Sequence, residues 1–540
     1  MIKVNFDKYF GAFMGAVVGD ALGWPYENRS NNIGGSAELA NRLSFIEWTR
    51  SSGGVYYKHK EIIRAGEYSD DSQLLLATAR SLTYQQEWSR VFMKLELPTW
   101  LLYQRGGGGA TIRAAESWSR GIVPWKNKEL AESYFNAGGN GVAMRILPHV
   151  FASSDSFREI AKQVVINGIS THGHPRAILG AIIYARALYH LTQKTGLLEY
   201  GELISLLIHN NDWEEFPNWY NANEWLTAAE EVTDSYGAIW VETIKEIRTG
   251  LDIIQKSFEK GLFDNTYETL AKLDCFNPKK NGAGTVTSLS ALYIASKYAT
   301  DPYTGLLEVL SFKNADSDTL VSMIGGLMGA LYGQEWIRSE WYGVQDFSYI
   351  KSLITKQLNN EGAIYTRGKW SDKDSNGVRQ GLKSWEVGQS ILFGTFGKSV
   401  VVEKSLLETN IKNLEVFSFK FQTEEGQLIF LKSYNKTKQT ENHIKSVINE
   451  AIDEQPSIKN VEILFINANQ LQELASYIPG RMYGKRAFQM IAKILERLAD
   501  KNKLTPEEIE LLSTELVQPG IDQLQVRTII KLLNEKIRKS

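Results

Sequence analysis

The stretch GAFMGAVVGDALG, residues 11–23, decides the fold of the first part of the chain. Its glycines recur every four residues, at Gly11, Gly15, Gly19 and Gly23. A second stretch, GGLMGALYG at residues 325–333, repeats this spacing at Gly325, Gly329 and Gly333. Residues four apart share one helix face, and glycine inside a helix costs about 0.5–1 kcal/mol relative to alanine. The repeated glycines therefore predict two helices against which other backbones pack closely.

Helical periodicity extends over most of the chain from residue 1 to about 360. Apolar residues recur three and four apart in LLLATARSL, residues 74–82, and in AILGAIIYARALYHL, residues 177–191. This spacing is typical of amphipathic helices, and no regular strand alternation interrupts it. The sequence predicts an all-α domain of many helices over residues 1–365.

The pattern changes in the last third of the chain. Residues 366–379, TRGKWSDKDSNGVR, are polar and turn-rich and predict a linker. The segment 414–434 alternates apolar and polar residues around TEEGQ, which predicts a hairpin. A further strand is expected at 460–468 and helices at 484–501 and 505–517, the last with Thr505 as N-cap and Pro506 at its first position. Residues 366–540 therefore predict a linker and a smaller α+β domain.

Composition and charge narrow the class of protein. Hydrophobic residues make up 43% of the 540 and the net charge is −2, so no global basic field indicates a nucleic-acid-binding protein. The single cysteine, Cys275, excludes an intrachain disulfide and fits a reducing compartment. The apolar runs are shorter than the roughly 20 residues that span a bilayer, and the N-terminus lacks a signal-peptide pattern. We expect a soluble, cytoplasmic protein that has no membrane partner.

Two predicted helices begin with clustered oxygen ligands. Ser69, Asp70 and Asp71 precede one helix, and Asp316, Asp318 and Thr319 precede the second glycine-spaced helix. Each cluster alone is explained by N-capping, which needs one such acceptor. Together they form an all-oxygen ligand set suited to Mg²⁺ or Mn²⁺ rather than zinc. If both helix starts face one cleft, they could hold two ions about 3.5–4 Å apart.

Other catalytic templates find little support in the chain. No GxxxxGK[ST] phosphate loop and no CxxC pair is present. RGGGGAT, residues 105–111, follows no clear strand, so it is weak evidence for a dinucleotide site. His172 and His174, two apart in STHGHP, cannot share a helix face, and their default interpretation is as polar loop residues.

The order of these motifs resembles one known family. GAFMGAVVGDALGWPYE, YSDDSQLLLATARSL, GNGVAMRILP, STHGHP and ADSDTLVSMIGGLMGALYG occur in that order between residues 8 and 335. Their sequence and order are similar to those of the ADP-ribosylglycohydrolase (ADP-ribosylhydrolase) family, which includes the dinitrogenase reductase-activating glycohydrolases.

The resemblance implies a fold, an activity and a set of site residues. It implies an orthogonal all-α domain with two Mg²⁺ or Mn²⁺ ions that hydrolyses the bond between ADP-ribose and a modified protein or other acceptor, with ADP-ribose as product. It implies Glu27 as the catalytic carboxylate. The implied metal ligands are Ser69, Asp70, Asp71, Asp316, Asp318 and Thr319. The implied substrate-binding residues are Gly108, Gly109, Gly139, Asn140, Gly141 and His172.

The chain departs from the family pattern at three points. Ser69 stands where many members have threonine, which preserves the hydroxyl oxygen. Ala315 interrupts a glycine-rich approach to Asp316. Gly138 stands where some members carry an aromatic residue that packs on adenine, so the adenine contact is not predicted.

The alternative function is a non-hydrolytic ADP-ribose-binding or structural member of the same fold. The resemblance does not cover the C-terminal domain, for which we expect a role in recruiting a partner or substrate. A nucleic acid acceptor is neither indicated nor excluded.

Overall fold

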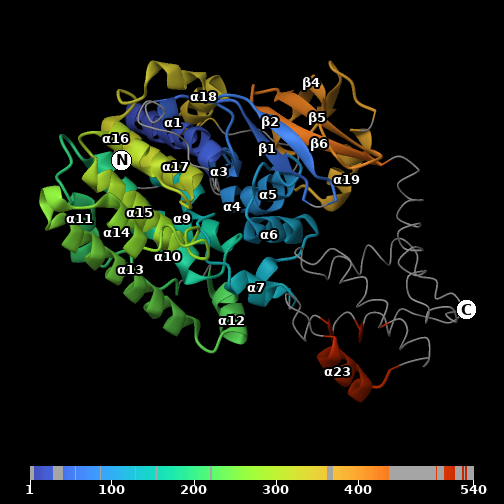
Figure 1. The fold of residues 1–540 in the computed structure, drawn as a ribbon, viewed down its shortest axis with the longest axis horizontal. Helices are drawn as coiled ribbons and strands as arrows, with labels where there is room; N and C mark the ends of the chain where they lie inside the picture. The colour runs from blue at the N-terminus through green and yellow to red at the C-terminus, as the bar shows by residue number, and fades with distance from the viewer. Residues whose placement is uncertain are drawn as a thin grey trace, which may run out of the picture. The chain divides into compact units, whose positions relative to one another are not determined.

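The computed structural model describes residues 5–27, 41–54, 56–84, 87–127, 129–152, 156–218, 222–359, 361, 369–382, 384–436, 494, 504–516, 526–527 and 530–531. Over these residues the chain is mostly helical with two small sheets (Figure 1). It divides into two compact units. The first contains residues 1–51, 60–408 and 416–433, and the second contains residues 52–59, 409–415 and 434–540.

The helices before the four-stranded sheet follow one another with few interruptions. They are α1 (Phe6–Gly23), η1 (Trp24–Tyr26), η2 (Asn41–Leu43), α3 (Asp70–Leu82), α4 (Trp88–Val91), η4 (Phe92–Glu96), α5 (Leu97–Trp100), α6 (Gly109–Ser119), η5 (Pro124–Lys126), α7 (Ala131–Phe135), η6 (Ala143–Arg145), α8 (Leu147–Ala152), α9 (Phe157–Ile169), α10 (Pro175–Gln193), α11 (Glu202–His209), α12 (Asn223–Val232), α13 (Tyr236–Phe258), η8 (Gly261–Phe263), α14 (Thr266–Lys272), α15 (Gly284–Lys297), α16 (Pro302–Ser311), α17 (Ser317–Tyr332), η9 (Ser339–Gly343), α18 (Phe347–Leu358) and α19 (Asp372–Gly381).

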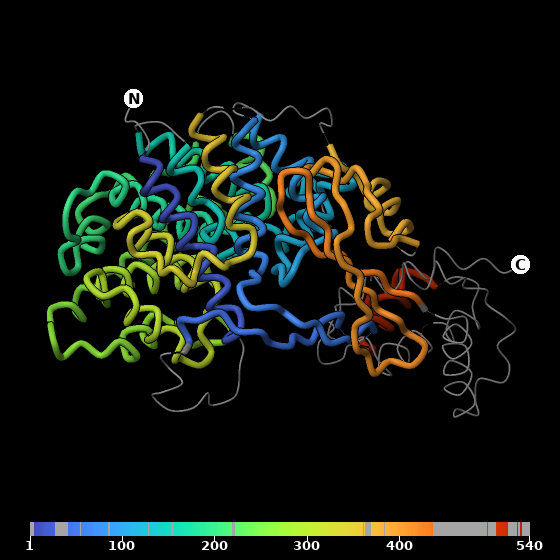
Figure 2. Tube along the Cα trace, turned by 90° about the horizontal axis from the view of Figure 1, so that it is seen from above, coloured from blue at the N-terminus to red at the C-terminus, as the bar shows by residue number. Residues whose placement is uncertain are grey.

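The glycine-spaced helices α1 and α17 pack against each other, and Figure 2 shows the dark blue α1 beside the yellow α17. The sequence predicts a close backbone neighbour for each helix, and the structure shows that each is the neighbour of the other. A Cβ atom added to Gly11 would lie 2.0 Å from the carbonyl oxygen of Gly333, and one added to Gly15 would lie 2.2 Å from that of Gly325. At the other end, a Cβ on Gly23 would lie 2.3 Å from the carbonyl oxygen of Ser317. Thus the two helices run antiparallel, and the C-terminal end of α1 meets the start of α17.

A second close helix pair supports the same core. A Cβ added to Gly180 of α10 would lie 2.4 Å from the carbonyl of Gly284, the first residue of α15. Around these pairs the largest hydrophobic cluster runs from Tyr9 to Ile354. The helical core therefore rests on backbone contacts that only glycine allows, and apolar side chains fill the space around them.

A four-stranded sheet in the order β3-β4-β5-β6 follows the helices, with the short turn η10 (Gly394–Phe396) between its first two strands. Its strands are β3 (Ser390–Leu392), β4 (Lys398–Leu407), β5 (Leu414–Thr423) and β6 (Leu428–Lys436). β4 is antiparallel to β3 and to β5, with a register shift between Val401 and Glu403. The predicted hairpin is confirmed, because β5 and β6 are neighbours joined by the turn at Gly426.

The apolar face of this sheet packs on helices of the first unit. Phe419, Phe421 and Leu431 belong to one hydrophobic cluster with Leu74 of α3 and Trp100 of α5. The sequence pattern assigns these strands to a separate domain after residue 365, whereas residues 416–433 lie within the first compact unit. The alternation of apolar and polar residues predicts that the sheet has an apolar face, but it does not predict which other element packs on that face.

Two short elements differ from the sequence prediction. β1 (Trp48–Ser52) and β2 (His59–Ile63) form a two-stranded sheet in the region where no strands were expected. The alternation of β2 is hard to recognise because two of its three buried positions hold His59 and Glu61. The expected linker contains α19, which begins with a capping box between Ser371 and Asp374.

In the second unit the structure describes α23 (Pro506–Glu515), which begins as predicted. Thr505 is its N-cap and accepts a hydrogen bond from the Glu508 amide, and Pro506 is its first residue. The strand expected at 460–468 lies outside the described residues, as does the helix expected at 484–501 apart from Ile494. No helix within the described residues is long and apolar enough to cross a membrane.

Candidate metal centre and active site

The start of α3 is held in place by a buried carboxylate on α1. Asp20 accepts hydrogen bonds from the amides of Ser69, at 3.1 Å, and Ser72, at 2.9 Å, and from the Ser72 hydroxyl at 2.6 Å. Ser69 is the N-cap of α3, and its hydroxyl accepts from the Asp71 amide. The capping role of Ser69 therefore leaves the carboxylates of Asp70 and Asp71 for other partners.

The start of α17 meets the start of α3. The Thr319 hydroxyl donates a hydrogen bond to the Asp71 carboxylate at 3.0 Å. The Thr319 amide donates to Asp318 Oδ1 at 2.8 Å. Ser317 donates to the carbonyl of Gly23 and so fixes α17 to the end of α1. The two predicted oxygen clusters thus lie together.

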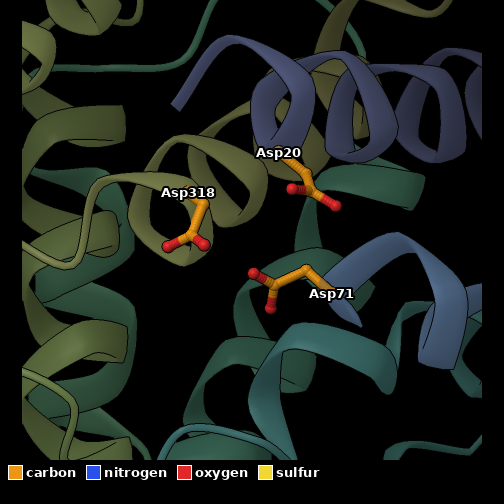
Figure 3. A group of neighbouring side chains, drawn as sticks. All are labelled: Asp20, Asp71 and Asp318. Carbon is orange, nitrogen blue, oxygen red and sulfur yellow. The ribbon is translucent and has the colours of Figure 1, made fainter. Parts of the chain in front are cut away.

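The structure brings the carboxylates into two overlapping groups. Asp20, Asp71 and Asp318 place one oxygen each within 4.8 Å of the others, and Figure 3 shows these three side chains converging from separate helices. Glu27, Asp316 and Asp318 form a second group by the same criterion. Asp318 belongs to both groups, so the two candidate ion positions are adjacent.

Mutual repulsion and burial raise the pKa values of these acids. Burial, followed by the charges of Asp20 and Glu27, raises the pKa of Asp70 to about 8. Burial and neighbouring carboxylates also raise the pKa values of Asp71, Asp318 and Glu27, while burial alone raises that of Asp20. A cluster of buried carboxylates carries negative charge that a cation would offset. Because all these donors are oxygens, the set fits hard divalent cations.

Asp20 was not among the predicted site residues. It lies in the middle of an apolar helix and is fully buried, and its sequence signal is a single carboxylate within the glycine-spaced face. A buried acid needs partners, and Asp20 finds them in the start of α3.

Asn140, a predicted substrate-binding residue, lies beside the second carboxylate group. Its side-chain amide donates to Asp316 Oδ2 at 2.8 Å and to the Thr287 hydroxyl at 3.1 Å. Its backbone amide donates to the carbonyl of Gly282, and Gly139 forms a bridge with Ala283. Asn140 thereby orients a carboxylate of the second group, and Thr287 is a further residue at the site that the sequence did not predict.

His172 lies against the same glycine loop. A Cβ atom added to Gly141 would lie 3.0 Å from His172 Cε1 and 3.2 Å from the Thr111 hydroxyl of α6. Burial and the positive charges of Arg145 and Arg113 lower the pKa of His172 to about 3. The imidazole is therefore neutral at physiological pH and is hydrogen-bonded to the Thr171 hydroxyl at 2.7 Å.

The loop before α6 contains the predicted substrate-binding glycines and also borders the acids. Gly108 is the N-cap of α6 and Gly109 its first residue, and both are exposed. Gly106 is the glycine of this loop that lies against the cluster, because a Cβ there would be 2.8 Å from Asp70 Oδ1. A small nearby hollow, open to solvent, is lined by residues that include Arg113, Tyr134 and Thr171.

The comparisons with known proteins assign the chain to a family. The family model for ADP-ribosylglycohydrolase matches residues 2–367. This chain belongs to the ADP-ribosylglycohydrolase family. The family therefore covers every predicted site residue, and its match ends before the four-stranded sheet begins.

Curated relatives share the region at low identity. The ADP-ribosyl-[dinitrogen reductase] glycohydrolase of Rhodospirillum rubrum is 24% identical over 250 residues, which cover 44% of this chain and 79% of that protein. The ADP-ribosylhydrolase ARH3 of Gallus gallus is 23% identical over 354 residues, covering 62% and 88%. A solved structure described as an ADP-ribosylglycohydrolase-related protein complex is 19% identical and covers 66% of this chain and 99% of its own, with a TM-score of 0.42.

Proposed function

We propose that this chain is a metal-dependent hydrolase that cleaves the glycosidic bond between ADP-ribose and a modified acceptor, with two Mg²⁺ or Mn²⁺ ions. The observation that carries the proposal is the pair of carboxylate groups that share Asp318 and draw on three separate segments of the chain. The family membership and the ADP-ribosylhydrolase names of the relatives support the reaction class.

The proposed metal ligands are the residues that begin α3 and α17. They are Ser69, Asp70, Asp71, Asp316, Asp318 and Thr319. Hydrogen bonds hold two of them in position, from the Ser69 amide to Asp20 and from the Asn140 amide to Asp316. Bound divalent cations would supply Lewis-acid and orienting chemistry for the ribose hydroxyls. Position matters here, because holding the sugar and a water in reacting geometry removes much of the entropic barrier.

Glu27 is the proposed catalytic carboxylate. It directly follows η1 and lies in the second carboxylate group, beside Asp316 and Asp318. Burial and the Asp316 charge raise its pKa, which makes its carboxylate a stronger base than an exposed glutamate. In the proposed reaction Glu27 accepts a proton from the attacking water as positive charge develops at C1″ of the ribose.

The remaining predicted residues would hold ADP-ribose. Gly139 and Gly141 leave room for the diphosphate, and the neutral His172 imidazole lies against them. Gly108 and Gly109 begin α6, whose N-terminal end favours anions.

The first experiment measures ADP-ribose release by mass spectrometry from arginine-linked, serine-linked and nucleic-acid-linked substrates. Wild type and Asp316→Ala are compared with Mg²⁺, Mn²⁺ and EDTA. We expect metal-dependent release by wild type and a loss of at least about 100-fold in Asp316→Ala, the scale of losing a group that stabilises the transition state. Asp252→Ala is the matched control, because Asp252 is an exposed residue of α13 paired only with Lys256.

The second candidate function is ADP-ribose binding without hydrolysis. If folded, metal-loaded wild type releases no ADP-ribose from any of these substrates, the hydrolase proposal fails. Calorimetry with ADP-ribose then tests the binding function, which requires an affinity that depends on the same carboxylates.

The C-terminal residues and the location remain separate proposals. We propose that residues 366–540, nearly all of which lie beyond the family match, recruit a partner or the substrate. We also propose a cytoplasmic location, which the single, buried Cys275 supports.

A further inference from the structure

Arg50 is a cation beside the metal centre that lacks a carboxylate partner. It lies in β1, is half-buried, and its guanidinium carbon is 5.3 Å from the centroid of the Trp24 ring. Trp24 is itself held edge-on to Trp48 at 5.3 Å. Within the described residues, Arg50 forms no ion pair or hydrogen bond. The Trp24 ring therefore lies beside a guanidinium whose N–H groups have no acceptor among the described residues.

The position of Arg50 relates it to the reacting end of the site. A Cβ atom at Gly106 would lie 2.8 Å from Asp70 Oδ1 and 3.4 Å from Arg50 Nη2, so these two groups flank the same glycine. The positive charge of Arg50 also acts on Glu27, lowering its pKa against the larger upward effect of burial. Arg50 therefore lies near both a proposed metal ligand and the proposed catalytic carboxylate.

The neighbouring cations differ from Arg50 because they are neutralised. Arg105 Nη2 lies 3.1 Å from Glu61 and 2.9 Å from Glu67. Lys432 lies 2.6 Å from Glu61. These side chains are largely buried. Their ion pairs join β2 and β6 to the loop that contains Arg105. Of these three cations, Arg50 is the one that has no ion pair within the part of the chain that the structure describes, so it can meet an anion from outside the chain.

We propose that Arg50 forms a phosphate subsite at the acceptor side of the centre, which selects ADP-ribose joined through C1″ to a phosphate group. The inference rests on the proposed hydrolase function and adds the chemical class of the acceptor. Arginine suits the role because its planar guanidinium binds phosphate oxygens through two parallel hydrogen bonds. The same charge disfavours a cationic leaving group such as the guanidinium of a modified arginine.

The reaction with such an acceptor balances without a further reagent. The oxygen of water forms a bond to C1″, and the bond between C1″ and the phosphate oxygen breaks. Its electron pair leaves on that oxygen, where the Arg50 charge stabilises it. The water proton passes through Glu27 to the phosphate, which gives ADP-ribose and free phosphate.

The test compares leaving groups of different charge under metal-saturated conditions. The probes are ADP-ribose 1″-phosphate, a short DNA with ADP-ribose on its 5′-phosphate, a serine-linked peptide and an arginine-linked peptide. In Arg50→Gln we expect the ratio of kcat/KM for phosphate-linked to serine-linked substrate to fall at least about tenfold, as when charge-assisted hydrogen bonds are lost. The ratio of arginine-linked to serine-linked activity should rise.

Two further variants make the result specific. Arg64→Gln removes an exposed arginine close by in the sequence, which pairs with Glu403 on the surface, and should leave both ratios at the wild-type value. Arg50→Lys keeps the charge without the planar fork and should recover part of the loss. A fall in only one phosphate-linked probe still supports the subsite and identifies whether a free or a polynucleotide phosphate is the source.

The contrary outcomes are distinct from failure of the hydrolase proposal. If wild type releases ADP-ribose from the serine-linked peptide but Arg50→Gln changes all substrates by the same factor, Arg50 only offsets the charge of the carboxylates and the phosphate subsite is wrong. Unchanged ratios also overturn it. If wild type releases ADP-ribose from none of the four probes, the hydrolase proposal itself fails. Hydrolysis in H₂¹⁸O adds a direct check, since attack at C1″ places the label in ADP-ribose rather than in phosphate.

Discussion

The helical core and the four-stranded sheet are fixed by different kinds of contact. In the core, α1 and α17 touch through backbone atoms at positions that only glycine can occupy. At the sheet, Arg80 of α3 and Glu96 of η4 form a buried ion pair. Two residues from the connections between the strands bind to this pair: Thr395 donates a hydrogen bond to Glu96, and Gln427 accepts one from Arg80, both at 2.6 Å. The first kind of contact has a sequence period, whereas the second links residues that are up to 347 positions apart.

This difference changes how the end of the family match should be interpreted. The family model ends at residue 367, yet the sheet that follows completes polar contacts of α3, the helix that begins with the proposed metal ligands. A chain cut after residue 365 would therefore leave Arg80 and Glu96 without Gln427 and Thr395. Side-chain substitutions separate the roles of the two regions more cleanly than such a truncation.

The largest effect is expected from breaking the buried ion pair. Glu96→Gln keeps the size of the side chain but leaves the Arg80 charge without its partner in a site where the two side chains are 8% and 0% exposed. We expect the free energy of unfolding to fall by about 3–5 kcal/mol, measured by urea denaturation. The loss should be accompanied by weaker metal binding, because α3 carries both the ion pair and the proposed ligands.

The matched control is a surface pair on a neighbouring helix. Glu87→Gln removes the partner of Arg90 where both side chains are more than half exposed, so less than about 1 kcal/mol should be lost. Replacing both buried partners, in Arg80→Met with Glu96→Leu, should recover part of the stability. A buried-pair loss no larger than the surface-pair loss would contradict the proposed role of the sheet contact.

A smaller loss is expected from disturbing the glycine contact. In Gly329→Ala the new Cβ would lie 2.0 Å from the carbonyl oxygen of Gly11, so α1 and α17 must separate. Overpacking of this kind costs about 1–3 kcal/mol, which the same urea titration measures. Gly377→Ala provides the control, because a Cβ there meets no atom within 4 Å and alanine favours the helix α19. If both variants gain stability, the close approach of the helices does not constrain the fold.

The same contrast explains what the sequence could predict. Glycine spacing, caps and alternating strands are local signals. They predicted that α1 and α17 each have a close backbone neighbour, and they predicted the start of α23 and the β5–β6 hairpin, but they did not identify α1 and α17 as partners. The grouping of Asp71 with Asp318 followed from two helix starts once the helices were paired. Asp20, Thr287 and Arg50 lack a local signal, because each one matters through a partner distant in sequence. The two-stranded sheet was missed since His59 and Glu61 occupy its buried face.

The smallest effect is a pH dependence that has opposite signs in the two regions. In the core, burial and Arg145 lower the pKa of His149 from 6.5 to about 3. As pH falls, His149 is therefore protonated in the unfolded chain before it is protonated in the folded chain. Its contribution to the free energy of unfolding is lost as pH falls below 6.5. At the sheet, burial raises the pKa of Asp346 from 3.8 to about 6, while Tyr68 and the Leu428 amide donate to its carboxylate. Here the folded chain holds the proton more tightly, so stability falls as pH rises from 3.8 towards 6.

Melting temperatures between pH 4.5 and 7.5 separate the two contributions. His149→Gln should reduce the loss of stability on acidification by about 1.4 kcal/mol per pH unit below 6.5. Asp346→Asn should remove the opposing loss between pH 4.5 and 6, so its curve should fall more steeply on acidification than that of wild type. If the two variants shift the pH profile in the same direction, the buried charges of the core and of the sheet contact do not differ as the structure indicates. Opposite shifts would show that the sheet contact has its own electrostatic balance within a single folding unit.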